Sequence, residues 1–209
     1  MILSDSSLRE AVRTGRIGFT PEIYDQQFQP ASIDFTLGRH FRAFKNAGLT
    51  QQPSFLKPEL LYDDGPLDVS NFNSDVEMEA FEAEYLVLGP RQFCLGTTAE
   101  RVRLPADLRG VLYGRSSLAR LGLVVHTVAG NLDPGFDGQI TLELLNVGTR
   151  ALKIPAGWRI AHVSFEELDM ASAQPYGQKR NSKYQGQEGA TASRIKNDMD
   201  HLEGRIVTR

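Results

Sequence analysis

The chain has 209 residues, 41% of them hydrophobic and 23% charged, so it can bury a core without disulfides or structural metals. Its single cysteine, Cys94, excludes an intramolecular disulfide and fits a reducing, cytoplasmic location. A net charge of −3 argues against nucleic acid as a partner. No apolar run approaches the ~18 residues of a membrane span, and no secretory signal is readable, so we expect no membrane association.

The first residues predict a short helix. Ser4 or Asp5 can cap it, Leu8 and Val12 follow at helical spacing, and Gly15 ends it.

Residues 29–38 predict a half-buried strand, because Ile33, Phe35 and Leu37 alternate with polar residues. From about residue 46 to 84 the sequence is irregular and contains several Pro, Asp and Asn residues. We expect this stretch to be a long insertion with one or two short strands and not a separate domain.

From residue 85 onward, short apolar stretches alternate with turn residues. We predict strands at 85–88, 92–95, 101–104, 111–113, 121–126, 140–147, 151–154 and 159–165. Many short strands at close spacing indicate a mainly β sandwich or barrel. After about Ser172 few apolar residues remain, so this tail must be disordered or dock on something. We expect residues 1–209 to form one domain.

Residues 114–120, Gly-Arg-Ser-Ser-Leu-Ala-Arg, follow a predicted strand. Arg115 and Arg120 offer forked cationic donors, Ser116 and Ser117 offer hydroxyls, and a helix start offers free backbone N–H groups. A phosphate chain binds to such groups. The alternative is a solvated helix start that Ser116 or Ser117 caps.

Residues 129–144 contain an Asp-Pro-Gly turn and then a strand. We expect a hairpin around this turn, with Asp133 as the Asx-turn residue. On the strand, one face carries Ile140, Leu142 and Leu144, and the other carries Gln139, Thr141 and Glu143. Glu143 is either a solvent-facing residue or a partly buried acid with a raised pKa that can move protons.

These segments resemble the dCTP deaminases of the trimeric dUTPase-like superfamily. Residues 114–123 are similar to the phosphate-binding motif of these deaminases and, more loosely, to the second dUTPase motif. The pattern Gly130-x-Leu132-Asp133-x-x-Phe136-x-Gly138 is similar to the third dUTPase motif. Ile140-Thr141-Leu142-Glu143 places a glutamate where the deaminases carry their catalytic one, and residues 175–194 resemble their closing segment. The resemblance covers nearly the whole chain except about residues 45–85.

The resemblance implies a homotrimer of distorted jelly-roll β-barrels with active sites between subunits. It implies dCTP as the substrate, Mg²⁺ bound through the triphosphate, and dTTP as a candidate feedback inhibitor. Residues 172–209 would form a C-terminal lid segment over nucleotide held by a neighbouring subunit.

The resemblance also assigns roles to individual residues. The triphosphate and the reacting base would be surrounded by Arg115, Ser116, Ser117, Leu118, Ala119 and Arg120. Asp133 would hold the 3′-hydroxyl and Phe136 would pack under the sugar. The base pocket would be lined by Thr141, Leu142 and Glu143, and the lid would contribute Tyr176, Lys183 and Gln187.

Deamination of cytosine requires water to attack the carbon that bears the amine, and the amine must leave protonated. We expect Glu143 to carry the proton between them, oriented by Arg120 and Ser116. The zinc route of other deaminases needs His-x-Glu followed by Pro-Cys-x-x-Cys. His201-Leu202-Glu203 supplies only the first half, so we expect no zinc.

The product depends on residues near the third motif. By the resemblance, Gly130-Asn131 favours a bifunctional enzyme that continues to dUMP and pyrophosphate, because deaminases that stop at dUTP tend to carry a bulky basic pair after the alanine equivalent to Ala129 and bifunctional members tend to carry glycine there. Glycine leaves room for a second water near Asp133. His162 stands where bifunctional members and dUTPases tend to carry glutamine, which favours dUTP as the final product. We expect deamination of dCTP to dUTP, with the bifunctional enzyme as the alternative. A pure dUTPase or a non-catalytic nucleotide sensor of this fold is a further alternative; intact Glu143 and Arg120 argue against the sensor.

Overall fold

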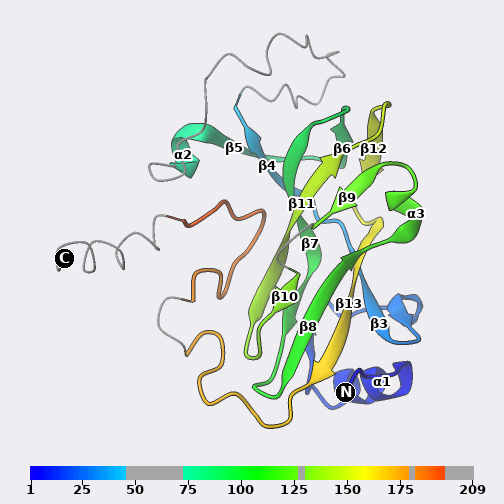
Figure 1. The fold of residues 1–209 in the computed structure, drawn as a ribbon, viewed down its shortest axis with the longest axis vertical. Coiled ribbons are helices and arrows are strands. Elements are labelled where there is room, and N and C mark those ends of the chain that lie inside the picture. Colours follow the sequence, from blue (N-terminus) through cyan, green and yellow to red (C-terminus); the bar gives the residue numbers. More distant parts are fainter. Residues whose placement is uncertain (46–72, 127–129, 179–181, 196–209) are drawn as a thin grey trace, which may run out of the picture.

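The computed structural model describes residues 1–45, 73–126, 130–178 and 182–195 (Figure 1). Much of the expected insertion (46–72), Ala129, and the segment with His201-Leu202-Glu203 lie outside these residues. None of the described helices is long and apolar enough to cross a membrane.

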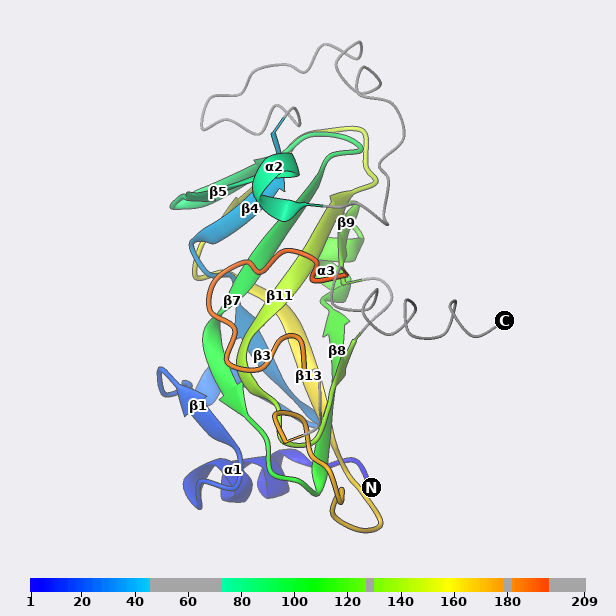
Figure 2. The same ribbon diagram turned by 90° about the vertical axis from the view of Figure 1, so that its left-hand side faces the viewer.

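The described residues form a mainly β fold of two large sheets and one small one (Figures 1 and 2). The first sheet has the order β5 (Met78–Glu82), β4 (His40–Phe44), β7 (Phe93–Arg103), β11 (Asp137–Asn146) and β9 (Leu123–Val125), with β1 (Gly18–Thr20) also paired to β7. The second has the order β10 (Asn131–Leu132), β8 (Leu108–Gly114), β13 (Arg159–Glu167), β3 (Ser32–Thr36) and β2 (Phe28–Gln29). The third pairs β12 (Leu152–Pro155) with β6 (Tyr85–Leu88). The helical pieces are α1 (Asp5–Arg13), η1 (Asp25–Gln27), α2 (Ser74–Glu77) and α3 (Ser116–Ala119).

The predicted amino-terminal helix is confirmed as α1. The Ser4 side chain accepts a hydrogen bond from the backbone N–H of Ser7, which caps the helix. Leu8 and Ala11 are buried, so one face of α1 packs against the end of the sheets.

The core lies between the two large sheets, as the burial pattern of β11 illustrates. Buried and half-buried residues alternate along all ten positions of this strand. Ile140, Leu142 and Leu144 are buried in the core, as predicted, while Thr141 and Glu143 point to the opposite face. One face of β11 thus packs in the core, whereas the face that carries Thr141 and Glu143 is available for other contacts.

Two strand predictions were wrong. The stretches 92–95 and 101–104 are parts of one continuous strand, β7, because the polar residues between them are buried and hydrogen-bonded. Thr97 donates to the carbonyl of Ile140 at 3.4 Å, and Thr98 donates to that of Glu100 at 2.7 Å. Strand β3 is not half-buried, since Asp34 is as buried as its apolar neighbours.

The expected hairpin around Asp133-Pro134-Gly135 is also absent as a pair of strands. The turn itself forms, since the N–H of Phe136 donates to the carbonyl of Asp133 at 3.0 Å. However, β10 pairs with β8 in the second sheet, whereas β11 pairs with β7 and β9 in the first. The turn therefore connects the two sheets.

The described part of the tail docks on its own chain, along the outward face of β11 (Figure 2). The N–H of Gln139 donates to the carbonyl of Gln187 at 3.0 Å, and the Gln187 amide donates back to the carbonyl of Gln139 at 2.6 Å. Farther along, the N–H of Thr191 donates to the Thr141 hydroxyl at 3.1 Å. The tail thus covers β11 of its own chain; that it closes over nucleotide held by a neighbouring subunit stays a prediction.

Cys94 lies fully inside the core, and burial raises the pKa of its thiol to about 12. At pH 8 the thiolate fraction would be about 10⁻⁴. We expect iodoacetamide to leave Cys94 unmodified in the native protein and to alkylate it fully in guanidinium chloride, as measured by intact mass. Rapid alkylation of the native protein would contradict this placement.

Candidate active site

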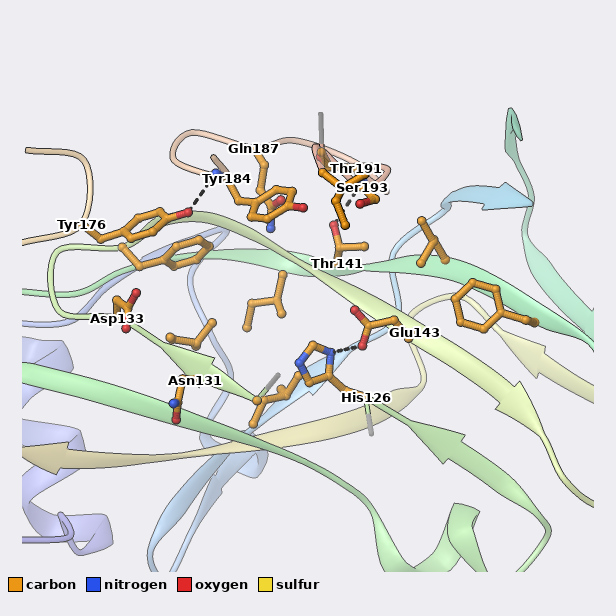
Figure 3. Close-up of a pocket in the computed structure, with 18 of the residues that line it drawn as sticks. His126, Asn131, Asp133, Thr141, Glu143, Tyr176, Tyr184, Gln187, Thr191 and Ser193 are labelled. Atoms are coloured by element: carbon orange, nitrogen blue, oxygen red, sulfur yellow. Dashed lines mark hydrogen bonds and ion pairs between the residues drawn. The ribbon is translucent and has the colours of Figure 1, made fainter. Parts of the chain in front are cut away.

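A cavity of about 560 Å³ lies between the outward face of β11 and the docked tail (Figure 3). Its polar lining consists of His126, Asn131, Asp133, Thr141, Glu143, Tyr176, Tyr184, Gln187, Thr191 and Ser193. Its apolar lining includes Phe44, Met78, Phe93, Leu95, Phe136, Ile140 and Ile195. A mostly apolar cavity with a few convergent polar groups is typical of a small-molecule site.

One end of the cavity is formed by the turn before β11 and by the tail. Phe136 packs against Tyr176 with ring centroids 6.1 Å apart and a tilt of 48°. The hydroxyl of Tyr176 accepts a hydrogen bond from the N–H of Tyr184 at 2.9 Å, which fixes the ring relative to the tail. Asp133 also lines this end (Figure 3), so the cavity has both a hydrogen-bond-accepting carboxylate and the apolar ring of Phe136 here.

Glu143 lies farther along β11 and points into the cavity (Figure 3). Its Oε2 is 2.7 Å from Nδ1 of His126, whose side chain is only 8% exposed. The Glu143 side chain is 37% exposed, and Leu95 is its direct cross-strand neighbour. Of the two sequence interpretations, the structure favours an acid in a cavity over a residue that faces open solvent.

His126 is a site residue that the sequence analysis did not single out. It directly follows β9, has a left-handed backbone with φ of 55°, and donates its N–H to the carbonyl of Glu143 at 3.0 Å. This backbone conformation is uncommon for a side-chain-bearing residue and is stabilised only by its surroundings. The single sequence signal was a histidine at the end of a predicted strand.

The candidate phosphate segment lies apart from this cavity within one chain. It forms the short helix α3, and its cap position is Arg115, which makes no side-chain capping bond. The expected alternative, a helix start capped by the hydroxyl of Ser116 or Ser117, is therefore not formed. Ser116, Ser117, Ala119 and Arg120 are exposed, and none of them lines the cavity. A single chain does not bring Ser116 or Arg120 to Glu143.

The tail residues differ in what they do. Tyr176 and Gln187 line the cavity, whereas Lys183 does not, and its carbonyl accepts a hydrogen bond from the Arg194 guanidinium. Gln187 is 8% exposed, and among the described residues its Oε1 has no hydrogen-bond partner. A ligand donor or an ordered water in the cavity would satisfy this acceptor. Leu142, which the resemblance assigns to the base pocket, is buried in the core and does not line the cavity.

Gly130 and His162 receive a structural explanation. A Cβ on Gly130 would stand 2.8 Å from the carbonyl oxygen of Leu112, so the close approach to β8 itself requires glycine. His162 stacks on Tyr113 with ring centroids 5.6 Å apart. Burial lowers the pKa of His162, with a further lowering by Arg115 and an opposing rise from Asp34. The lowered pKa favours the neutral form of His162, and this residue does not line the cavity.

Two glycines test the docking of the tail. A Cβ on Gly135 would stand 2.6 Å from Cβ of Pro175, whereas Gly157 has nothing within 4 Å, and both have similar positive φ angles of 85° and 78°. Both Gly→Ala variants should lose about 1 kcal/mol to backbone strain. Only Gly135→Ala should also release the tail, which is measured as faster tryptic cleavage at Lys183 and Arg194. Equal cleavage rates in the two variants would contradict the docking.

Comparison with known proteins identifies the family of this chain. The model of the dCTP deaminase-like family matches residues 2–168. A dCTP deaminase of Natronomonas pharaonis is 42% identical over 96% of this chain and 97% of that protein. A protein of Methanosphaera stadtmanae named "dCTP deaminase, dUMP-forming" is 38% identical over 97% of this chain and 98% of that protein.

The solved dCTP deaminase of Agrobacterium tumefaciens shares the fold. It superposes with a TM-score of 0.58 at 18% identity, over 80% of this chain and 48% of that one, so the present chain spans about half of its length. The expected mainly β architecture is thereby confirmed. Because the family model and relatives of about 40% identity both span most of the sequence, the chain belongs to the dCTP deaminase-like family.

Proposed function

We propose that this protein hydrolyses dCTP to dUTP and ammonia at the cavity beside β11. The observation that carries the proposal is Glu143, a carboxylate directed into a mostly apolar cavity and paired with His126. A group that moves protons between water and a base needs this combination of partial desolvation and a fixed position.

The reaction balances with one water and one shuttling carboxylate. Glu143 takes a proton from water while the water oxygen attacks C4 of cytosine, and it passes this proton to the ring nitrogen N3. Glu143 then takes the proton of the new C4 hydroxyl and passes it to the amine. The C4–N bond then breaks, ammonia leaves, and the carbonyl of uracil remains. His126, 2.7 Å from Glu143, holds the carboxylate in the cavity during these transfers.

The other end of the cavity suits a deoxyribose. Asp133 would accept a hydrogen bond from the 3′-hydroxyl, and Phe136 would pack under the sugar. Phe136 offers no polar partner, so a ribose 2′-hydroxyl would be buried without one, which disfavours CTP. Tyr176 and Gln187 would close the cavity from the tail.

The triphosphate would reach residues 114–120 of another subunit. These residues carry the required donors but lie apart from the cavity of their own chain. A homotrimer with shared sites explains this separation, with Arg115, Ser116, Ser117 and Arg120 acting across the interface and Lys183 from the tail. An active monomer in sedimentation velocity would contradict it.

Magnesium would enter with the nucleotide. Within the part of the chain that the structure describes, no group of three or more His, Cys, Asp or Glu residues could hold a metal ion. Oxygen atoms of the triphosphate and water would therefore supply most of the Mg²⁺ ligands.

A second product is supported by a specific observation, since several relatives that match nearly the whole chain are named dUMP-forming. Ammonia and pyrophosphate should therefore be measured together, with dCTP and with dUTP. Ammonia alone supports the deaminase, and both products from dCTP support the bifunctional enzyme. Pyrophosphate from dUTP alone, or no turnover, contradicts deamination. Addition of dTTP to the same assay tests feedback inhibition.

A further inference from the structure

Arg115 is held by groups from two neighbouring strands. Its Nη2 lies 3.6 Å from Oδ2 of Asp34 on β3, and its Nη1 donates to the main-chain carbonyl of Arg159 on β13 at 3.3 Å. The Asp34 side chain is only 3% exposed, and its Oδ2 also accepts from Nη1 of Arg159 at 3.2 Å. One buried carboxylate therefore serves two guanidinium groups.

The sheet brings these groups together from distant parts of the sequence. Strands β8, β13 and β3 are neighbours, and His162 of β13 lies opposite both Tyr113 of β8 and Asp34 of β3. Arg115 directly follows β8, so its side chain reaches back across β13 to Asp34. Asp34 does not line the cavity beside β11, and it takes no part in the proposed proton transfers.

Burying a carboxylate is costly unless charged partners are fixed around it. Here the same pairing fixes Arg115, because both of its terminal nitrogens are anchored and the guanidinium plane is set. A guanidinium that is already fixed loses less side-chain entropy when a ligand binds to it. Such fixing therefore strengthens binding to this planar, forked donor.

We propose that Asp34 is a positioning residue that holds the Arg115 guanidinium in the orientation that receives a phosphate chain. The inference rests on the proposed phosphate-binding function of residues 114–120. It extends that function to a buried residue about 80 positions earlier in the chain, and it predicts an effect on phosphate affinity alone.

The test compares binding of inorganic tripolyphosphate and of deoxycytidine to the full-length assembled protein by calorimetry. Asp34→Asn keeps the size of the side chain and removes its charge. Tripolyphosphate affinity should fall about tenfold, since a charge-assisted anchor is lost, while deoxycytidine affinity stays within about twofold. In an Arg115→Gln background, Asp34→Asn should have no further effect, because the two residues act through one another.

The matched control is Glu166→Gln, which removes a carboxylate that is 2.7 Å from Arg109 on the same two strands, β8 and β13. It should leave both affinities unchanged. Asp34→Glu, which retains the charge, should weaken tripolyphosphate binding less than Asp34→Asn.

Unchanged tripolyphosphate affinity, equal losses for both ligands, or additive effects with Arg115→Gln would overturn the proposal. Failure of both Asp34 variants to fold would also overturn it, because the role would then be in the fold. Ammonia release by the wild type is measured in parallel. A wild type without it contradicts the deamination, whereas the tripolyphosphate comparison still decides the role of Asp34.

Discussion

Glu143→Gln should abolish ammonia release from dCTP while leaving nucleotide binding nearly unchanged. General acid–base groups contribute on the order of 10²–10⁴-fold to rates, and here one carboxylate serves both the water and the leaving amine. The loss should therefore reach the upper end of that range. Glutamine keeps the size and a carbonyl oxygen near His126, so the cavity should keep its shape.

The measurement is single-turnover ammonia release together with the affinity for dCTP. Glu79→Gln, at an exposed position on β5, is the control that removes a carboxylate away from the cavity. Near-wild-type ammonia release by a Glu143→Gln enzyme that still binds dCTP would rule out the proposed mechanism.

Removal of residues 175–209 should leave the fold intact and reduce ammonia release by about 10²-fold or more, since loss of a closing element misplaces the reacting groups. In the described part of this segment only Pro175, Gln187 and Ala192 are buried, so little core is lost. Its cavity-lining residues include Tyr176, Tyr184 and Gln187.

Removal of residues 196–209 alone is the matched control, because it keeps every described contact between the tail and β11. This shorter deletion should retain most of the activity. Thermal unfolding of both truncated proteins by circular dichroism shows whether the core persists. A fully active protein without residues 175–209, or one that is unfolded, would contradict the role of the tail as a lid.

Strand β11 shows how far the sequence predicts the fold. Its two-residue alternation correctly separated Leu142 and Leu144 in the core from Thr141 and Glu143 on the other face. Such periodicity is local, so it can be read from one segment. The pairing of Glu143 with His126 could not be read in this way, because it depends on the register between β9 and β11 and on a left-handed residue.

Strands β7 and β3 show where local patterns mislead. Thr97 and Thr98 lie between the strands predicted at 92–95 and 101–104, and their hydroxyls are satisfied by backbone carbonyls inside the core, so the strand continues through them. Asp34 indicated a solvent-facing position, but arginines more than 80 residues away allow it to be buried. In both cases partners that are distant in sequence override the expected exposure of a polar residue.

The candidate site was also predicted only in part. The resemblance assigned Asp133, Phe136, Thr141, Glu143, Tyr176 and Gln187, and all of them line one cavity. It assigned Arg115, Ser116, Arg120 and Lys183 to the same site, and within a single chain they lie outside that cavity. Their roles stay predictions that depend on assembly of the subunits.

The most direct test of the deamination is mass spectrometry of the product formed from dCTP in ¹⁸O-labelled water. Hydrolysis at C4 predicts stoichiometric ammonia and a single ¹⁸O in the uracil base. In the bifunctional case, cleavage to dUMP adds ¹⁸O to the released dUMP or pyrophosphate, without loss of label from the base. Recovery of unlabelled cytosine nucleotide without ammonia, whatever happens to the phosphates, would contradict deamination by this protein.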